Sequence, residues 1–254
     1  MLEPILIWAL VAFLAQLVDG TLGMAYGTIT TSALVTLGVL PALASASVHV
    51  AEIFTTLSSG SFHLRFGNVD RKIALCLITP GVIGGIAGAY IATSMAVKLL
   101  RAIVSFILLC MGFTILYKFA FKNKKHLQAK EPSPKVLVPL GFIAAFIDAL
   151  GGGGWGPITT TTLVVNNVKP NIAIGSVNFS EFFITTAIAV AFLILIGPER
   201  VDWLIILGLT MGGVVCAPIS PWLCKKLPQR ILGLLVGTTV IMLNIRIIFY
   251  LIFG

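Results

Sequence analysis

Residues 148–162 read DALGGGGWGPITTTT, a glycine run followed by a threonine run, and apolar sequence lies on both sides. Each glycine destabilises a helix by about 1 kcal/mol relative to alanine, so the helix expected from Val136 should break here. In lipid an unpaired backbone group is costly, and irregular backbone survives only where protein covers it or where it lines a watery cavity. The stretch is therefore a candidate functional site.

The same stretch occurs twice in the chain. Residues 19–31 read DGTLGMAYGTITT and match the second copy at an offset of 129 positions, without a gap from Asp19/Asp148 to Glu52/Glu181. Beyond Glu52 the match needs a three-residue gap before Val69-Asp70 falls on Val201-Asp202. We therefore expect two copies of one unit, with this division: residues 1–121 as the first transmembrane repeat, 122–135 as a basic linker, and 136–254 as the second repeat.

The composition indicates an integral membrane protein. The chain is 58% hydrophobic and only 10% charged, and its mean hydropathy is positive, which is typical of a chain with several spans. The net charge of +8 lies in short loops beside apolar segments, so it predicts membrane orientation rather than nucleic-acid binding. The four cysteines have no metal-type spacing, and we expect no metal or cofactor and treat these thiols as packing residues: Cys76, Cys110, Cys216 and Cys224.

Ten apolar segments, five in each half, predict an all-α polytopic fold. The first two segments of each half are shorter than the roughly 20 residues that a full span needs. We expect each such pair to form two half-length helices or a hairpin that dips in and returns, while the other three segments cross. The ten segments are residues 4–18, 21–38, 43–64, 73–95, 101–121, 136–149, 157–167, 171–196, 203–223 and 230–253.

Loop charges predict the orientation in the plasma (inner) membrane, because Lys and Arg of short loops stay on the cytoplasmic side. The basic linker 122–135 and the loop with Arg65, Arg71 and Lys72 are placed in the cytoplasm, and the slightly acidic loop around Glu199 is placed outside. Equivalent loops then fall on opposite faces, which predicts inverted repeats with both termini outside. A parallel duplication is the alternative.

Inverted repeats with discontinuous helices place the substrate site near the midplane, where the repeats meet. A helix that restarts after a break points free N–H groups and a partial positive charge of about half an electron into such a cavity. This arrangement favours an anion, and the neighbouring threonines and serines add neutral donors.

Several of these motifs resemble the sulfite exporter TauE/SafE family of membrane permeases. The resemblance lies in residues 18–27, in residues 46–56 (ASVHVAEIFTT) and in residues 67–70 (GNVD), and again in residues 151–157 and 174–182 of the second copy. It covers nearly the whole chain. It implies a transporter of small sulfur-containing anions such as sulfite, sulfoacetate or thiosulfate, and the motif does not distinguish among these substrates.

The candidate site residues flank the two breaks. Glu52 and Glu181 either take part in proton coupling or hold the broken helices as protonated, hydrogen-bonded groups. Asp19 and Asp148 resemble N-caps, and this structural role and a coupling role can coexist. His49, opposite Asn178 in the duplication, is either an anion ligand when charged or a neutral core residue. Tyr26 and Trp155 either line the cavity or pack. The substrate candidates are Gly23, Tyr26, Gly27, Thr30, Thr31, Ser47, His49, Gly152, Trp155, Gly156, Thr159, Thr160, Ser176 and Asn178.

The function expected from the sequence is secondary transport of a small anion by alternating access. An inside-negative potential favours export, at about 2.3 kcal/mol per charge for 100 mV. A passive anion channel is the alternative, and an intramembrane enzyme using His49 and Glu52 is disfavoured because the second repeat lacks the histidine. The expected partners are the anion, the bilayer and a coupled proton, and a homodimer is compatible with the sequence.

Overall fold

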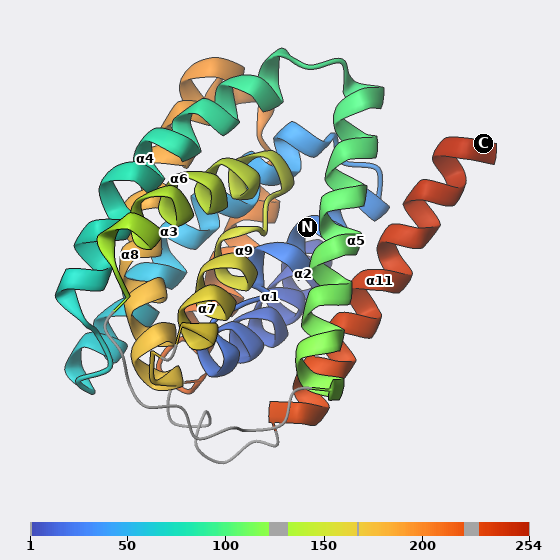
Figure 1. Cartoon of the computed structure of the whole chain (residues 1–254). Helices are drawn as coiled ribbons and strands as arrows, with labels where there is room; N and C mark the ends of the chain where they lie inside the picture. The colour runs from blue at the N-terminus through green and yellow to red at the C-terminus, as the bar shows by residue number, and fades with distance from the viewer. Residues whose placement is uncertain (1, 122–131, 167, 221–228, 254) are drawn as a thin grey trace.

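The computed structural model in Figure 1 describes residues 2–121, 132–166, 168–220 and 229–253. Most of the predicted linker 122–135, and the loop with Lys225 and Lys226, lie outside the described residues. The helices in chain order are α1 (Leu2–Leu22), α2 (Tyr26–Thr36), α3 (Pro41–Arg65), α4 (Arg71–Ser94), α5 (Val97–Phe121), α6 (Pro134–Gly151), α7 (Trp155–Val165), α8 (Pro170–Ile196), the short 3-10 helix η1 (Pro198–Arg200), α9 (Trp203–Cys216) and α11 (Gln229–Phe253). The predicted all-α fold with helices broken at glycine-rich stretches is confirmed.

Equivalent residues begin equivalent helices in the two halves. Pro41 and Pro170 occupy the first turns of α3 and α8, where a missing N–H costs nothing. The carboxylates of Asp70 and Asp202 accept two backbone N–H groups each at the starts of α4 and α9, which is the N-cap arrangement. Equivalent residues of the duplicated sequence therefore mark the starts of α3 and α8, and of α4 and α9.

Both glycine-rich stretches interrupt their helices. Gly23 has a φ of +67° and Gly152 a φ of +64°, and these equivalent residues end α1 and α6 with a left-handed turn that glycine adopts at little cost. The first break lies later than predicted. Helix α1 continues through Gly20 to Leu22, because an isolated glycine inside a helix is tolerated and Gly20 packs closely against Ser220.

Helices of one half of the chain pack mainly on helices of the other half. Helix α4 of the first half packs on α6 of the second, α9 of the second half packs on α1 of the first, and α3 lies against α8. Small residues form both exchanged seams: Gly84 and Gly88 contact the backbone carbonyls of α6, and Gly208 and Gly212 contact those of α1. Small residues four apart let helix backbones approach in membranes, so the seams tie the halves together.

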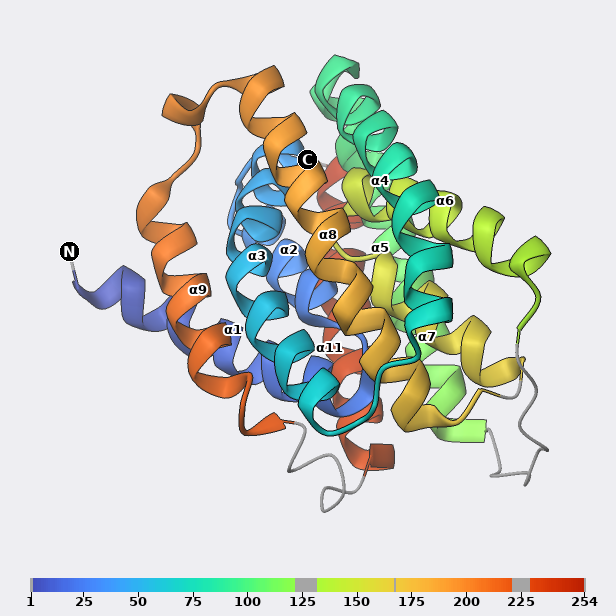
Figure 2. The same ribbon diagram turned by 90° about the vertical axis from the view of Figure 1, so that its left-hand side faces the viewer.

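Equivalent helices run in opposite directions. In Figure 1, α5 descends and its neighbour α11 ascends, side by side. Figure 2 shows the same for α3 and α8, and it places the α3–α4 turn at the opposite end of the bundle from the segment between α8 and α9. In these two pairs the equivalent helices are therefore antiparallel to each other.

Five described helices are long and apolar enough to cross a bilayer: α1, α4, α5, α6 and α8. Helix α3 has 25 residues but falls outside this set, since it carries buried serines, threonines, His49 and Glu52 along its length. Helices α2 and α7, with 11 residues each, are half-length, as predicted. The same prediction was wrong for their partners α1 and α6, which are long enough to span, and α9, expected to cross, is a shorter apolar helix of 14 residues. Helix α9 ends at Cys216 rather than at the predicted residue 223, and Pro218 follows two residues later, where it favours termination.

Candidate functional site

The two helix breaks cross each other and exchange hydrogen bonds. Thr31 donates its hydroxyl to the carbonyl of Gly152 at 2.7 Å, and Thr160 donates to the carbonyl of Gly23 at 2.7 Å. Both pairs are related by the offset of 129 positions. No other described group donates to either carbonyl, so each repeat satisfies the interrupted backbone of the other.

Glycine is required at the crossing itself. A Cβ atom on Gly27 would lie 2.5 Å from the Gly152 carbonyl oxygen, and one on Gly156 would lie 2.8 Å from the Gly23 carbonyl oxygen. Gly27 and Gly156 are again equivalent positions. The two backbones therefore touch directly at the crossing.

The starts of α2 and α7 keep unpaired backbone donors. The Asp148 carboxylate accepts the N–H of Trp155 at 3.1 Å, and Asp19 takes a backbone hydrogen bond from the equivalent residue Tyr26. These are capping contacts of the kind predicted for both aspartates. The next N–H groups, on Gly27 and Gly156, donate to no described residue. Two equivalent donors thus remain for a ligand.

His49 links α3 to α6 in the interior. Its Nε2 lies 3.1 Å from the Asp148 carboxylate, and its Nδ1 lies 2.7 Å from the Ser45 carbonyl oxygen. Because a carbonyl only accepts, Nδ1 carries a proton. The second proton lies either on Nε2, opposite an ionised Asp148, or on the Asp148 carboxyl, and the pair is neutral overall in both cases. His49 is fully buried.

The two duplicated glutamates have different surroundings. Glu52 accepts a hydroxyl hydrogen bond from Thr185 at 3.3 Å, and its Oε1 lies 3.1 Å from the Cβ position of Gly27. Glu181 is 7% exposed and has no hydrogen-bond partner among the described residues. It interacts electrostatically with Asp19, Glu52 and Asp148, so the predicted carboxylates lie within electrostatic range of Glu181.

Four other predicted residues use their polar atoms within the protein. Thr30 donates to the Tyr26 carbonyl of its own helix, and Thr159 donates likewise to the Trp155 carbonyl. The Tyr26 hydroxyl donates to the Leu209 carbonyl at 3.0 Å, and the Trp155 indole donates to the Val177 carbonyl at 3.3 Å. These aromatic residues are buried packing residues with satisfied polar ends.

Three predicted residues lie away from the crossing contacts. The Ser176 hydroxyl accepts the backbone N–H of Asp70 at 2.8 Å, which fixes the α3–α4 turn to the start of α8. Asn178 accepts a hydrogen bond from Ser59 at 2.7 Å. Ser47 is buried within α3, and no hydrogen bond of its hydroxyl defines a role for it.

The sequence interpretation missed three contact residues. Thr28 donates to the Gly153 carbonyl at 2.8 Å, Ser45 donates to the Ala149 carbonyl at 2.8 Å, and Thr185 contacts Glu52. The duplication held a signal for Thr185, because Thr56 and Thr185 are also 129 positions apart. Thr28 had no such signal, since its counterpart is Pro157.

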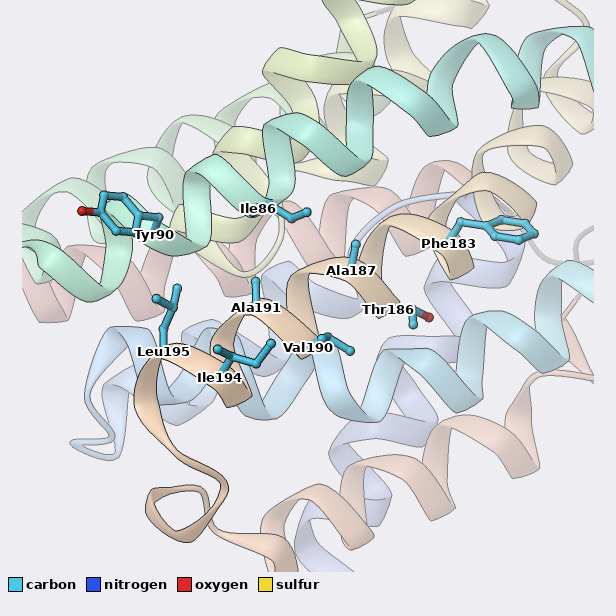
Figure 3. A pocket seen from close by; sticks show the side chains of 9 residues that line it. All are labelled: Ile86, Tyr90, Phe183, Thr186, Ala187, Val190, Ala191, Ile194 and Leu195. Atoms are coloured by element: carbon cyan, nitrogen blue, oxygen red, sulfur yellow. The ribbon is translucent and has the colours of Figure 1, made fainter.

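An apolar groove on the outside of the bundle is unrelated to this cluster. It has a volume of about 540 Å³ and lies between α4 and α8. In Figure 3, Ile86 and Tyr90 from α4 face a row of α8 side chains that includes Phe183 and Val190. Such a surface suits acyl chains.

Among the described residues no group of acidic, histidine and cysteine side chains could hold a metal, and Cys76, Cys110 and Cys216 are free thiols.

Comparison with known proteins gives two matches over most of the chain. Residues 8–247 match the family model described as sulfite exporter TauE/SafE. The chain belongs to this family. It is also 42% identical over 248 residues to the Bacillus subtilis (strain 168) protein named "Probable membrane transporter protein YtnM", covering 96% of this chain and 83% of that one. No solved structure matches. This TauE/SafE protein is a membrane transporter and not an enzyme.

Proposed function

We propose that this TauE/SafE protein transports small sulfur-containing anions, such as sulfite or organosulfonates, across the plasma membrane by alternating access. The two repeats, residues 1–121 and 136–254, insert with opposite topology, and the crossed breaks mark the midplane site. The family description supports the substrate class, since it names sulfite export. The expected direction is export, which an inside-negative potential favours for an anion that crosses alone and which the outward gradient of the anion itself favours when a proton crosses with it.

The crossing of the two breaks is the observation that carries this proposal. It is a reciprocal, duplicated contact between two half-length helices, and it leaves the N–H groups of Gly27 and Gly156 unpaired at the positive ends of those helices. Helix starts of this kind bind anions through backbone donors. Discontinuous helices that meet at the midplane are typical of secondary transporters built from inverted repeats.

The acidic surroundings indicate that the anion does not enter alone. Two like charges 4 Å apart repel by about 4 kcal/mol at an effective dielectric constant near 20, so several ionised carboxylates would oppose an anion strongly. Protons on some of these carboxylates would remove the repulsion. Proton coupling is therefore part of the proposed mechanism.

The opposite course of α3 and α8, and of α5 and α11, supports inverted insertion (Figures 1 and 2). The turn between α3 and α4 lies at one end of the bundle and the segment between α8 and α9 at the other (Figure 2); in the sequence the first is flanked by Arg65, Arg71 and Lys72, and the second contains Glu199 and Asp202. The positive-inside rule then places the first group in the cytoplasm, together with the linker, and puts both termini outside.

Reconstitution into proteoliposomes tests the proposal. Labelled sulfite, sulfoacetate and thiosulfate should enter vesicles that contain the folded protein and should not enter protein-free vesicles. Unlabelled anion on the opposite side should accelerate the exchange, because a carrier returns faster when loaded. Absence of flux for all three anions would refute the proposed function, whereas flux without counterflow would indicate a channel.

A further inference from the structure

The two duplicated glutamates, Glu52 and Glu181, have different hydrogen-bond partners. Glu52 has a hydroxyl donor in Thr185 and a backbone neighbour in Gly27. Glu181, at the equivalent place in α8, is more than nine-tenths buried and has no hydrogen bond to any described residue, and its carboxylate oxygens are not among the fully enclosed unpaired atoms, so they keep some exposed surface. The counterpart of Thr185, Thr56, donates instead to the backbone carbonyl of Glu52 at 2.5 Å. The arrangement around one glutamate is thus missing around the other.

No cation in the described structure compensates Glu181. His49 is the one imidazole near the cluster, and it forms a neutral pair with Asp148. The titratable groups that interact with Glu181 or with its neighbours are the carboxylates of Asp19, Glu52 and Asp148, the imidazole of His49 and the phenol of Tyr26. The Tyr26 hydroxyl donates a hydrogen bond to the Leu209 carbonyl. The described part of the chain contains no ion pair of a lysine or arginine with these acids.

An unpaired carboxylate in such a place has a simple chemistry. A buried charge without a partner is costly, and the group takes up a proton instead. The protonated carboxyl gains an O–H donor that it lacks when ionised, and this donor can point to an anion held at the neighbouring helix starts. The ionised form would repel the same anion. Proton and anion therefore favour each other's binding, and this coupling is reciprocal.

We propose that Glu181 is the residue that binds the co-transported proton, while Glu52 keeps a fixed position against Thr185 and Gly27. A proton from the water on one side adds to a Glu181 oxygen as the anion binds, and both leave to the other side. No covalent bond in the substrate changes. This inference rests on the proposed anion transport and adds the identity of the coupling group.

The test separates transport from coupling. Wild-type protein and the Glu181→Gln variant are reconstituted with the membrane potential clamped, and a labelled sulfonate serves as the probe because its sulfonate group keeps its charge at neutral pH. Two rates are measured: exchange without a gradient, and accumulation driven by a proton gradient. Glutamine resembles the protonated carboxyl, so the variant should keep exchange.

For one proton per monoanion, one pH unit should raise the vesicle content of the wild type about tenfold, since each tenfold ratio corresponds to about 1.4 kcal/mol. Glu181→Gln should lose this accumulation and retain the exchange. Glu199→Gln, at an exposed carboxylate, is the matched control and should keep both exchange and accumulation. Glu52→Gln, at the duplicated position beside Gly27, should change the exchange rate but keep the accumulation ratio. A pH indicator inside the vesicles should report proton entry with the anion in the wild type.

The outcomes are distinguishable. Gradient-driven accumulation by Glu181→Gln, or its loss in Glu52→Gln alone, overturns the assignment to Glu181. Anion flux by the wild type without proton movement also overturns it, and this readout needs no variant to fold. Absence of any flux in the wild type refutes the proposed function instead.

Discussion

Removing the two exchanged threonine hydroxyls should destabilise the protein more than removing two equally buried neighbours. Valine has nearly the same shape as threonine, so Thr31→Val and Thr160→Val leave no cavity and delete only the hydrogen bonds to Gly152 and Gly23. Because these carbonyls have no other described donor, each substitution leaves an unsatisfied acceptor in the interior. Hydrogen bonds in membrane bundles contribute about 0.6 kcal/mol on average, and an unsatisfied buried acceptor costs about 1–3 kcal/mol.

We therefore expect each single variant to lose about 1–2 kcal/mol and the double variant about 2–4 kcal/mol of unfolding free energy. Thr30→Val and Thr159→Val are the matched controls. These hydroxyls are as deeply buried, but they donate to carbonyls of their own helices four residues earlier. Those carbonyls already accept helical N–H groups, so the controls should lose at most about 0.5 kcal/mol.

Equilibrium unfolding in mixed micelles with increasing denaturing detergent measures these differences. Equal losses in the crossing pair and the control pair would refute the reasoning, because the exchanged hydrogen bonds would then contribute nothing beyond ordinary helical ones. The four single variants and the two double variants also give the coupling between the two bonds.

Three further predictions concern the glycines of the crossing, the His49–Asp148 pair and the orientation of the two repeats. Gly27→Ala and Gly156→Ala should lower the unfolding free energy by about 1–3 kcal/mol through overpacking and reduce anion flux in vesicles. The control Gly151→Ala, whose added Cβ would have its nearest neighbour 3.3 Å away, should have a smaller effect on both. Equal losses in all three variants would contradict the close crossing. His49→Ala should lower the unfolding free energy by about 3–5 kcal/mol because it leaves the buried Asp148 carboxylate without its partner. Adding Asp148→Asn should restore part of that free energy. If the double variant recovers none of it, the His49–Asp148 pair does not stabilise the protein. On a cysteine-free background, Lys72→Cys and Arg200→Cys should react with an impermeant maleimide from opposite sides of the membrane, and labelling from one side would refute inverted insertion.

Much of the architecture could be predicted from the chain because hydrophobic length and glycine content act locally. The ten apolar segments correspond to the ten described α-helices, and the second break falls within its glycine run. The first break was placed too early, since Gly20 looked like a helix breaker. A single glycine that packs against Ser220 stays helical, and this packing is a tertiary effect absent from a local pattern.

The candidate site was predicted in part. The duplication identified the glycines and threonines that meet at the crossing, because equivalent residues must meet if the repeats meet. It could not show that Thr30 and Thr159 turn back to their own helices while Thr31 and Thr160 reach across, as these are adjacent residues on a helix. Nor could it show that Ser176 holds the α3–α4 turn, because that contact joins residues 106 positions apart.

The exchanged glycine seams bear on how such a chain could arise. Gly84 and Gly88 of α4 pack on α6, and Gly208 and Gly212 of α9 pack on α1, and both contacts join one half of the chain to the other. With the opposite insertion proposed above, a half-length polypeptide would bury the same backbone surfaces only against a second, inverted copy of itself. In a single chain the two copies need not be identical, and they differ at positions such as His49 and Asn178.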